Sequence, residues 1–226
     1  MKYKNIKQGN FISRPNRFIA NVEIDGQTHV VHVKNTGRCK ELLISGATVF
    51  LEESDNSNRK TKYDLISVYK GDKLINIDSN APNKVFYELV RESGFFKDIV
   101  FIKPETKYKN SRFDFYIETK NKKIYIEVKG VTLEENGVLM FPDAPTERGI
   151  KHINELCDCI FEGYDAYIIF IIQMNNVKYF TPNYKTHNAF GEALKTAQKQ
   201  GVNILALDCD ITEDEITARN FVEVRL

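Results

Sequence analysis

The chain has 226 residues, of which 42% are hydrophobic, and its 32 lysine and arginine residues nearly balance its 31 aspartate and glutamate residues. These proportions exclude a disordered chain and indicate a globular protein of one large domain or two small ones. The longest apolar run, residues 166–172, is too short to cross a bilayer, and no charged-then-apolar leader opens the chain. The four cysteines form no CxxC pair. We therefore expect a cytoplasmic protein with reduced thiols and no membrane partner.

Positive charge is concentrated in two stretches of this near-neutral chain. Residues 1–40 carry eight lysine and arginine residues against two acidic ones, and residues 97–123 carry eight against four. Local basic concentrations of this kind favour a polyanionic partner such as DNA. Ordinary solvated lysine faces are the alternative for many of these residues.

Alternating polar and apolar residues recur through the first third of the chain. The alternation predicts strands over residues 10–24, 27–34, 47–53, 64–70 and 73–78. A short helix is expected over residues 38–43. Five short strands predict a small closed β-barrel in residues 1–80, with the OB-fold as the first choice and an SH3-like barrel as its competitor.

Two places in this barrel offer groups that suit a phosphate. Arg14 and Arg17 interrupt the first strand, and their guanidinium groups are suited to phosphate contacts. Asn35, Thr36 and Arg38 belong to a turn that leads into the expected helix, where side chains and backbone N–H groups together favour an anion. A capped helix with a solvent-facing arginine is the alternative interpretation.

A break at residues 79–82 leads us to place the second domain at residues 81–226. Asn80 is suited to cap a helix and Pro82 to its first turn, and apolar spacing predicts a helix over residues 82–92. Glu88 lies beside the apolar stripe of this helix. It is either a surface residue or an additional acid that reaches a site on the neighbouring sheet.

The pattern of the remaining chain alternates between strands and helices. Strands are predicted over residues 99–108, 112–119, 123–131, 137–141, 164–173, 203–209 and 221–224, and helices over residues 147–161 and 187–200. The order α-β-β-β-α-β-α-β predicts an α+β or α/β domain with a central mixed sheet. Thr146 is suited to cap the first of these two helices. Arg148 and His152 share a face near the N-terminus of that helix, which favours anions, so they are candidates for phosphate contacts; a solvated face is the alternative.

The hairpin between the second and third strands of this domain gathers charge on one face. Asp114 belongs to its first strand, and Glu127 and Lys129 belong to its second strand. If residues 120–121 form the tip, Asp114 lies opposite Glu127. If the tip is one residue later, Asp114 faces Lys129 and lies diagonal to Glu127. Either register brings two carboxylates and one ammonium group together.

Like charges paired across strands are destabilising, and a divalent cation would offset their repulsion. Asp114 and Glu127 are therefore expected to bind Mg²⁺ or Mn²⁺, with Glu88 as a further ligand. Such a cation lowers the pKa of a bound water and stabilises charge on a phosphate. Lys129 would orient or activate the water or neutralise the transition state, so the hairpin predicts a site for phosphodiester hydrolysis.

Several motifs resemble those of a known family. They are HVVHVKNTGR at residues 29–38, SRFDF at 111–115, IEVKGVTL at 126–133 and FPDAPTERGIKHINEL at 141–156. Over nearly its whole length the chain resembles the sugar fermentation stimulation protein A family, and its C-terminal half resembles the PD-(D/E)xK nuclease superfamily. Phe113, rather than proline, precedes Asp114. The resemblance implies an OB-like domain followed by a restriction-endonuclease-like αβββαβ domain, and non-specific DNA binding.

Three functions are compatible with these patterns. The first is a DNA-binding protein with a nuclease-like, Mg²⁺-dependent phosphodiesterase site, which would make it a deoxyribonuclease. It would act in the regulation of sugar utilisation, as the family name suggests. The second is a non-catalytic DNA-binding transcriptional regulator, since nuclease-like folds also host inactive binders. The third is a sugar-phosphate binder that uses Asn35, Arg38 and the helix that begins near Arg148. Homo-oligomerisation is left open.

Overall fold

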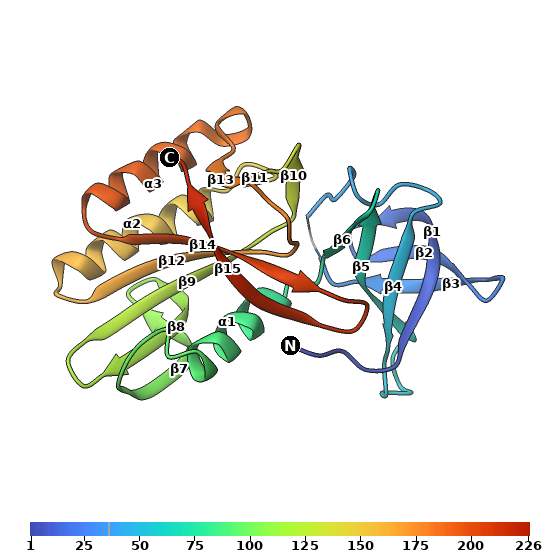
Figure 1. The fold of residues 1–226 in the computed structure, drawn as a ribbon, viewed down its shortest axis with the longest axis horizontal. Helices are drawn as coiled ribbons and strands as arrows, with labels where there is room; N and C mark the ends of the chain where they lie inside the picture. The colour runs from blue at the N-terminus through green and yellow to red at the C-terminus, as the bar shows by residue number, and fades with distance from the viewer. Residues whose placement is uncertain (36) are drawn as a thin grey trace.

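The computed structural model describes residues 1–35 and 37–226, and Thr36, one of the phosphate-binding candidates, lies outside the described residues. The first strands of the chain are β1 (Ile6–Asn16), β2 (Ile19–Ile24), β3 (Gln27–Val33), β4 (Thr48–Glu53), β5 (Tyr63–Lys70) and β6 (Lys73–Asn76). β1 pairs with β2 and β4, and the ring closes because β3 and β4 both pair with β5. This closed five-stranded barrel confirms the OB-fold prediction (Figure 1).

Two details of the barrel differ from the expectation. The stretch predicted as one strand is two antiparallel strands, because the side-chain oxygen of Asn16 accepts hydrogen bonds from the N–H groups of Phe18 and Ile19 and closes a tight turn. The prediction of a helix over residues 38–43 is wrong. Cys39 has a φ of 45° and begins a hydrogen-bonded turn that ends at Leu43. That left-handed conformation is incompatible with the start of a right-handed helix.

The second unit is a nine-stranded mixed sheet with three helices: α1 (Ala81–Glu92), α2 (Glu147–Phe161) and α3 (Tyr184–Lys199). Its strands are β7 (Ile99–Tyr108), β8 (Ser111–Thr119), β9 (Lys123–Val131), β10 (Leu133–Glu135), β11 (Val138–Phe141), β12 (Asp165–Ile172), β13 (Tyr179–Pro182), β14 (Asn203–Ile211) and β15 (Ile216–Val224). They lie in the order β10-β11-β13-β15-β14-β12-β9-β8-β7. Every helix and strand predicted for this half is present, and the short strands β10 and β13 are additional.

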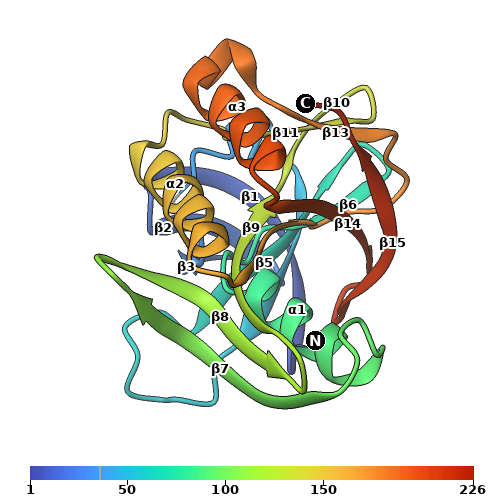
Figure 2. The same cartoon turned by 90° about the vertical axis from the view of Figure 1, so that its left-hand side faces the viewer.

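The helices divide the core of this unit into two layers. α2 and α3 pack together on one face of the sheet, and α1 packs on the other face against β9, β12 and β15 (Figure 2). β12 is buried on both sides, as its continuous apolar run predicts, and it pairs in parallel with both β9 and β14. The hairpin of β8 and β9 therefore lies in the sheet with a helix on each face.

The barrel and the sheet are joined by a shared core and by buried hydrogen bonds. Apolar residues of both units pack in one cluster; among them are Met1, Tyr3, Phe50, Ile66 and Phe86. Gln173 donates from its side-chain amide to Asn76 Oδ1 at 2.9 Å and to the carbonyl of Asp78 at 3.0 Å. These buried hydrogen bonds hold the two units in a defined relative position. None of the helices is long and apolar enough to cross a membrane in the part of the chain that the structure describes.

Candidate active site

The β8–β9 hairpin has the first of the two registers considered from the sequence. Phe115 pairs with Ile126, and the N–H of Thr119 donates to the carbonyl of Lys122 at 2.9 Å, so residues 120–121 form the tip. In this register Asp114 is opposite Glu127. The backbone pairing of β8 with β9, however, extends from the tip only as far as Phe115 and does not include Asp114.

The side chain of Asp114 accepts two hydrogen bonds just beyond the end of the β8–β9 pairing. Its Oδ2 accepts a hydrogen bond from the backbone N–H of Val128 at 2.8 Å, and its Oδ1 accepts one from Nδ2 of Asn83, in the first turn of α1, at 2.8 Å. The regular alternation that the sequence suggested is interrupted here, because Phe113 packs in the α2-side core and Phe115 in the α1-side core. The carboxylate is thus held between the hairpin and the start of α1.

Glu127 is buried, and two basic side chains share one of its carboxylate oxygens. Its Oε1 accepts hydrogen bonds from Nζ of Lys129 and from Nδ1 of His152, the latter at 2.6 Å. Its Oε2 is buried and accepts no hydrogen bond from the described residues. A buried carboxylate oxygen without a partner is costly, so this atom is suited to bind a ligand.

The two carboxylates differ in their proton affinity. Burial raises the pKa of Asp114, the negative charge of Glu127 raises it further, and the hydrogen bonds from Val128 and Asn83 oppose these effects only in part. Burial also acts to raise the pKa of Glu127, but the hydrogen bond from His152 and the charge of Lys129 outweigh it, so that the pKa of Glu127 is lowered. The structure thus brings Asp114, Glu127 and Lys129 together, with Glu127 ionised beside a more basic carboxylate.

The donor set suits a hard divalent cation that keeps part of its water shell. Two carboxylates, one with a free buried oxygen, are typical ligands of Mg²⁺ in sites where water and phosphate complete the coordination. Within residues 1–35 and 37–226, no group of three or more His, Cys, Asp or Glu side chains is placed to hold a metal ion by itself. A cation at Asp114 and Glu127 would therefore need oxygen ligands from water or from a substrate.

Glu88 is not brought to this pair. Its carboxylate accepts a hydrogen bond from the terminal ammonium group of Met1, which also donates to the carbonyl of Ile216. Glu88 follows Asn83 by five residues in α1, so the two side chains point in directions about 140° apart. Since Asn83 is the residue that faces Asp114, the expected contact of Glu88 with the metal site is not supported by its position.

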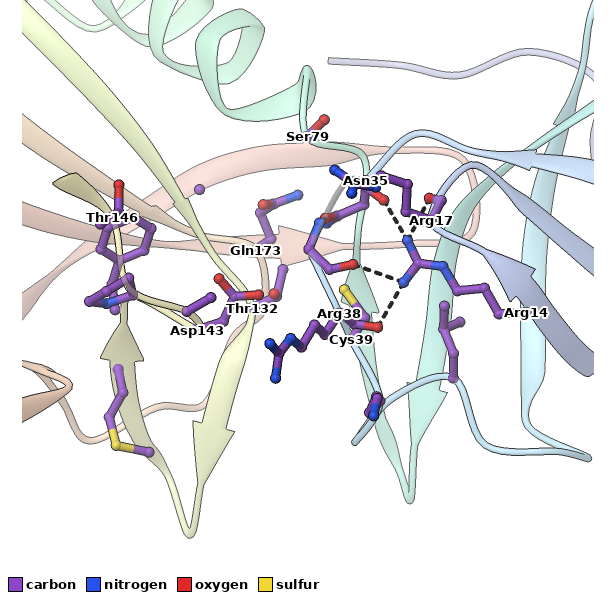
Figure 3. Close-up of a pocket in the computed structure, with 18 of the residues that line it drawn as sticks. Arg14, Arg17, Asn35, Arg38, Cys39, Ser79, Thr132, Asp143, Thr146 and Gln173 are labelled. Carbon is purple, nitrogen blue, oxygen red and sulfur yellow. Dashed lines mark hydrogen bonds between the residues drawn. The ribbon is translucent and has the colours of Figure 1, made fainter. Parts of the chain in front are cut away.

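A cleft of about 720 Å³ separates the barrel from the sheet next to this site. The barrel contributes Arg14, Arg17, Asn35 and Arg38, and Thr132, which directly follows β9, lies on the side of the sheet (Figure 3). Gly130, near the end of β9, also lines the cleft. We refer to it as the inter-unit cleft. Four of the five barrel residues proposed from the sequence for phosphate binding therefore line one cavity, and the fifth, Thr36, lies outside the described residues. Gly130 directly follows Lys129 in the chain.

The roles of these four residues are not equal. The two terminal nitrogens of Arg14 donate to four backbone carbonyls at 2.6–2.8 Å, those of Arg17, Asn35, Gly37 and Arg38 (Figure 3). The side chain of Asn35 is likewise occupied by the N–H of Gly37 and the carbonyl of Ile77. Arg14 and Asn35 thus shape the loop, so they are not the free phosphate contacts that the sequence suggested.

Arg17 and Arg38 remain available to a ligand. In the described part of the chain no carboxylate pairs with either guanidinium group. Arg17 lies over the ring of the exposed Phe18, with 5.8 Å between the guanidinium carbon and the ring centroid. A phosphate contact from Arg17 and Arg38 therefore stays a prediction that their positions allow.

The two phosphate-binding candidates on α2, Arg148 and His152, also have different surroundings. Arg148 is exposed near the N-terminus of the helix, which Thr146 caps by accepting from the N–H of Gly149 at 3.0 Å. His152 is buried, with 4% of its surface exposed, and bonds Glu127. The solvated face that was the alternative for His152 is wrong, and the structure places its imidazole against Glu127 instead of leaving it free for a phosphate. Sequence reasoning missed this partner, although the apolar Ile153 beside it was a sign that this side of α2 faces the sheet.

The fold and the site together define a protein in which an OB barrel precedes a restriction-endonuclease-like domain with a carboxylate pair and a lysine on its central hairpin. Comparison with known families agrees. The family description "SfsA N-terminal OB domain" matches residues 12–77, and "Sugar fermentation stimulation protein RE domain" matches residues 80–215. The chain belongs to the sugar fermentation stimulation protein family.

Relatives share the full length of the chain. It is 63% identical over 226 residues to the sugar fermentation stimulation protein homolog of Clostridium beijerinckii, covering 100% of both chains. It is also 63% identical to the homolog of Desulfitobacterium hafniense strain Y51, covering 100% of this chain and 99% of that one. Among solved structures it resembles Pyrococcus furiosus SfsA in complex with Ca²⁺, with 30% identity, coverage of 100% and 98%, and a TM-score of 0.90.

Proposed function

We propose that this protein binds DNA and hydrolyses its phosphodiester bonds with Mg²⁺ or Mn²⁺ at Asp114, Glu127 and Lys129. The observation that carries the proposal is the buried Oε2 of Glu127, which has no partner and lies beside a second carboxylate whose proton affinity is raised by the first. A cation bound by both acids would relieve the repulsion and supply the missing contact. The description of the Pyrococcus furiosus relative as a Ca²⁺ complex supports a site for an oxygen-preferring cation in this family.

Each residue of the site has a defined task in this proposal. Asp114 and Glu127 would hold the cation, which when bound polarises the phosphate and lowers the pKa of a coordinated water. His152 fixes the orientation of Glu127 by occupying Oε1, which leaves Oε2 for the cation. Lys129 donates to the same Oε1, and its side chain is 18% exposed, so that it can also donate to an attacking water or to a phosphate oxygen.

The inter-unit cleft would hold the DNA backbone next to these groups. Arg17 and Arg38 are the free guanidinium groups at its barrel side, and they suit phosphate oxygens because an arginine can donate two parallel hydrogen bonds. Contacts of this kind position the backbone without reading sequence. We therefore infer non-specific DNA binding, with the regulation of sugar utilisation that the name of the family suggests as its biological setting. The four cysteines are buried and unpaired, which supports the inference of a cytoplasmic protein.

Cleavage of DNA by matched variants tests the proposal. Supercoiled plasmid and single-stranded DNA are incubated with the wild-type protein in Mg²⁺, in Mn²⁺ and in a chelator, and the same is done with Lys129→Ala and Lys123→Ala. Lys123 is the matched control because it is an exposed lysine on the same strand, at the far end of β9. The expected result is metal-dependent cleavage by the wild type and by Lys123→Ala, and none by Lys129→Ala, with DNA affinity unchanged. Equal cleavage by both variants would contradict the role of Lys129.

A non-catalytic DNA-binding regulator is the second candidate. The observation that favours it is that, in the residues the structure describes, no third acidic or histidine side chain is placed to complete a metal site with Asp114 and Glu127. This candidate predicts DNA binding with a steep salt dependence and no cleavage by the wild type under any metal condition.

A further inference from the structure

A second, smaller cleft opens beside the acidic pair, away from the barrel. It has a volume of about 430 Å³ and lies between the turn that joins β7 to β8 and the first turns of α2. Four basic side chains line it, Lys107 from β7, Arg112 from β8 and Arg148 and Lys151 from α2. We refer to it as the β7–β8 cleft.

The positive charge of this cleft is poorly balanced by the protein. Arg112 pairs with Glu105 at 3.3 Å, but both side chains are more than 60% exposed, and pairs of this kind contribute little. Lys151 lies 3.9 Å from Glu155, at the limit of an ion pair. Among the described residues no carboxylate pairs with Lys107 or Arg148. Gathering four cations from three elements is unfavourable unless an anion joins them.

His152 connects this cleft with the acidic pair. Its Nδ1 bonds Glu127, and its Nε2 lies 3.5 Å from Nε of Arg148 on the cleft side. The ring is buried, with only 4% of its surface exposed, and it lines the cleft. An anion held by Arg148 is therefore connected to Glu127 through the guanidinium group and one imidazole ring.

The two clefts lie on opposite sides of the acidic pair along the same edge of the sheet. The inter-unit cleft reaches Gly130 at the end of β9 and Gln173 beyond β12, whereas the β7–β8 cleft reaches Ser111 at the start of β8. The strands follow one another in the order β12, β9, β8, β7, and the acidic pair is carried by β8 and β9. A chain of phosphates that crosses the acidic pair from the barrel side would next meet the β7–β8 cleft.

We propose that the β7–β8 cleft is a second phosphate subsite, which binds a phosphate group of the polynucleotide strand on the side of the acidic pair away from the barrel. This inference rests on the proposed function for the nature of the ligand. The phosphate is either an internal phosphodiester of a strand that continues past the site or a monoester at the end of a strand. Lys107 and Arg148 contribute most, because their charges are not offset by a carboxylate in the described residues.

Binding in a chelator tests this subsite independently of cleavage. The affinity of a fluorescein-labelled single-stranded oligonucleotide is measured by anisotropy at several KCl concentrations for the wild type and for the double variant Lys107→Gln/Arg148→Gln. The matched control is Lys97→Gln/Lys199→Gln, which removes the same charge from exposed lysines near the hairpin tip and at the C-terminal end of α3. Thermal melting establishes that both variants fold.

The expected result is an affinity about tenfold or more lower for the cleft variant, because each lost bond involves a charged donor. The slope of log K against log salt should fall by about 1.4, which corresponds to two lost phosphate contacts on a single strand. The control should retain the wild-type slope. Oligonucleotides with and without a terminal phosphate distinguish the two sources of the phosphate. A terminal monoester is the ligand if the wild type prefers the phosphorylated strand and the cleft variant does not. An internal phosphodiester is the ligand if neither protein discriminates between the two strands.

Two other outcomes would overturn one proposal or both. If the wild type binds and the cleft variant matches the control in affinity and slope, the subsite is absent while the proposed function stands. If the wild type shows no salt-dependent binding to any oligonucleotide, DNA binding itself is refuted, and the subsite with it.

Discussion

Replacing Arg14 by alanine tests whether this residue is a structural part of the barrel. Its guanidinium group donates four hydrogen bonds to backbone carbonyls of the loops that border the inter-unit cleft. Two of these bonds, to Gly37 and Asn35, are partly buried, and the two to Arg17 and Arg38 are exposed. Water can replace the exposed pair, so the loss of stability comes mainly from the partly buried pair.

The magnitude follows from these two bonds. A hydrogen bond that involves a charged group contributes about 1.5–3 kcal/mol, so the pair contributes about 3–6 kcal/mol. Release of the ordered arginine side chain returns about 2 kcal/mol of conformational entropy. The expected net destabilisation of Arg14→Ala is therefore about 1–4 kcal/mol. For a chain of this length it corresponds to a fall in Tm of roughly 2–16 °C.

Urea unfolding and thermal melting of Arg14→Ala and Arg17→Ala measure the difference. Arg17 is the matched control because its guanidinium group contacts the ring of Phe18 and no carboxylate among the described residues. The free energy of unfolding of Arg17→Ala should stay within about 0.5 kcal/mol of the wild type, while its affinity for DNA falls. If Arg14→Ala is as stable as Arg17→Ala, the loop-organising role of Arg14 is refuted and a direct phosphate contact becomes the better explanation.

The structure makes two further predictions about stability. Gly130→Ala should be destabilised by about 1–3 kcal/mol in urea unfolding, because the added Cβ would lie 2.6 Å from Oε1 of the buried Gln173 and 2.7 Å from Pro82. A fully stable variant would mean that the end of β9 packs less tightly than described. Burial acts to raise the pKa of Asp64, but the hydrogen bonds from Arg59 and its other partners hold that pKa at about 2, below its unfolded value near 4. The stability from this shift, on the order of 2 kcal/mol, is present at neutral pH and is lost as the pH falls from about 4 to about 2. Asp64→Asn should lack this part of the acid transition, and an unchanged acid profile would argue against the ion pairs.

The parts of the site that local patterns determine could be predicted from the sequence. Strand alternation placed Asp114, Glu127 and Lys129 on neighbouring strands, and the structure brings them together in the first of the two registers considered. The bounds of α2 also agree with the prediction, because an amphipathic period and a capping threonine are both local signals.

Contacts that depend on tertiary packing could not be predicted in this way. His152 reaches Glu127 only because α2 crosses over β9, and no local pattern encodes that crossing. Arg14 lies in a basic stretch that suggests phosphate binding, but its partners are carbonyls of loops up to 24 residues away. Glu88 is an acidic residue on the helix next to the site, as a metal ligand would be. Its side chain, however, points toward the terminal ammonium group of Met1, which packs against α1.

The central claim is that Asp114 and Glu127 share a divalent cation. The most direct test is a crystal soaked in Mn²⁺, with anomalous difference density measured at the site. A peak within bonding distance of Oε2 of Glu127 and of the carboxylate of Asp114, absent in crystals of Glu127→Gln, is the predicted result. Ordered, vacant carboxylates in the presence of millimolar Mn²⁺ would contradict it.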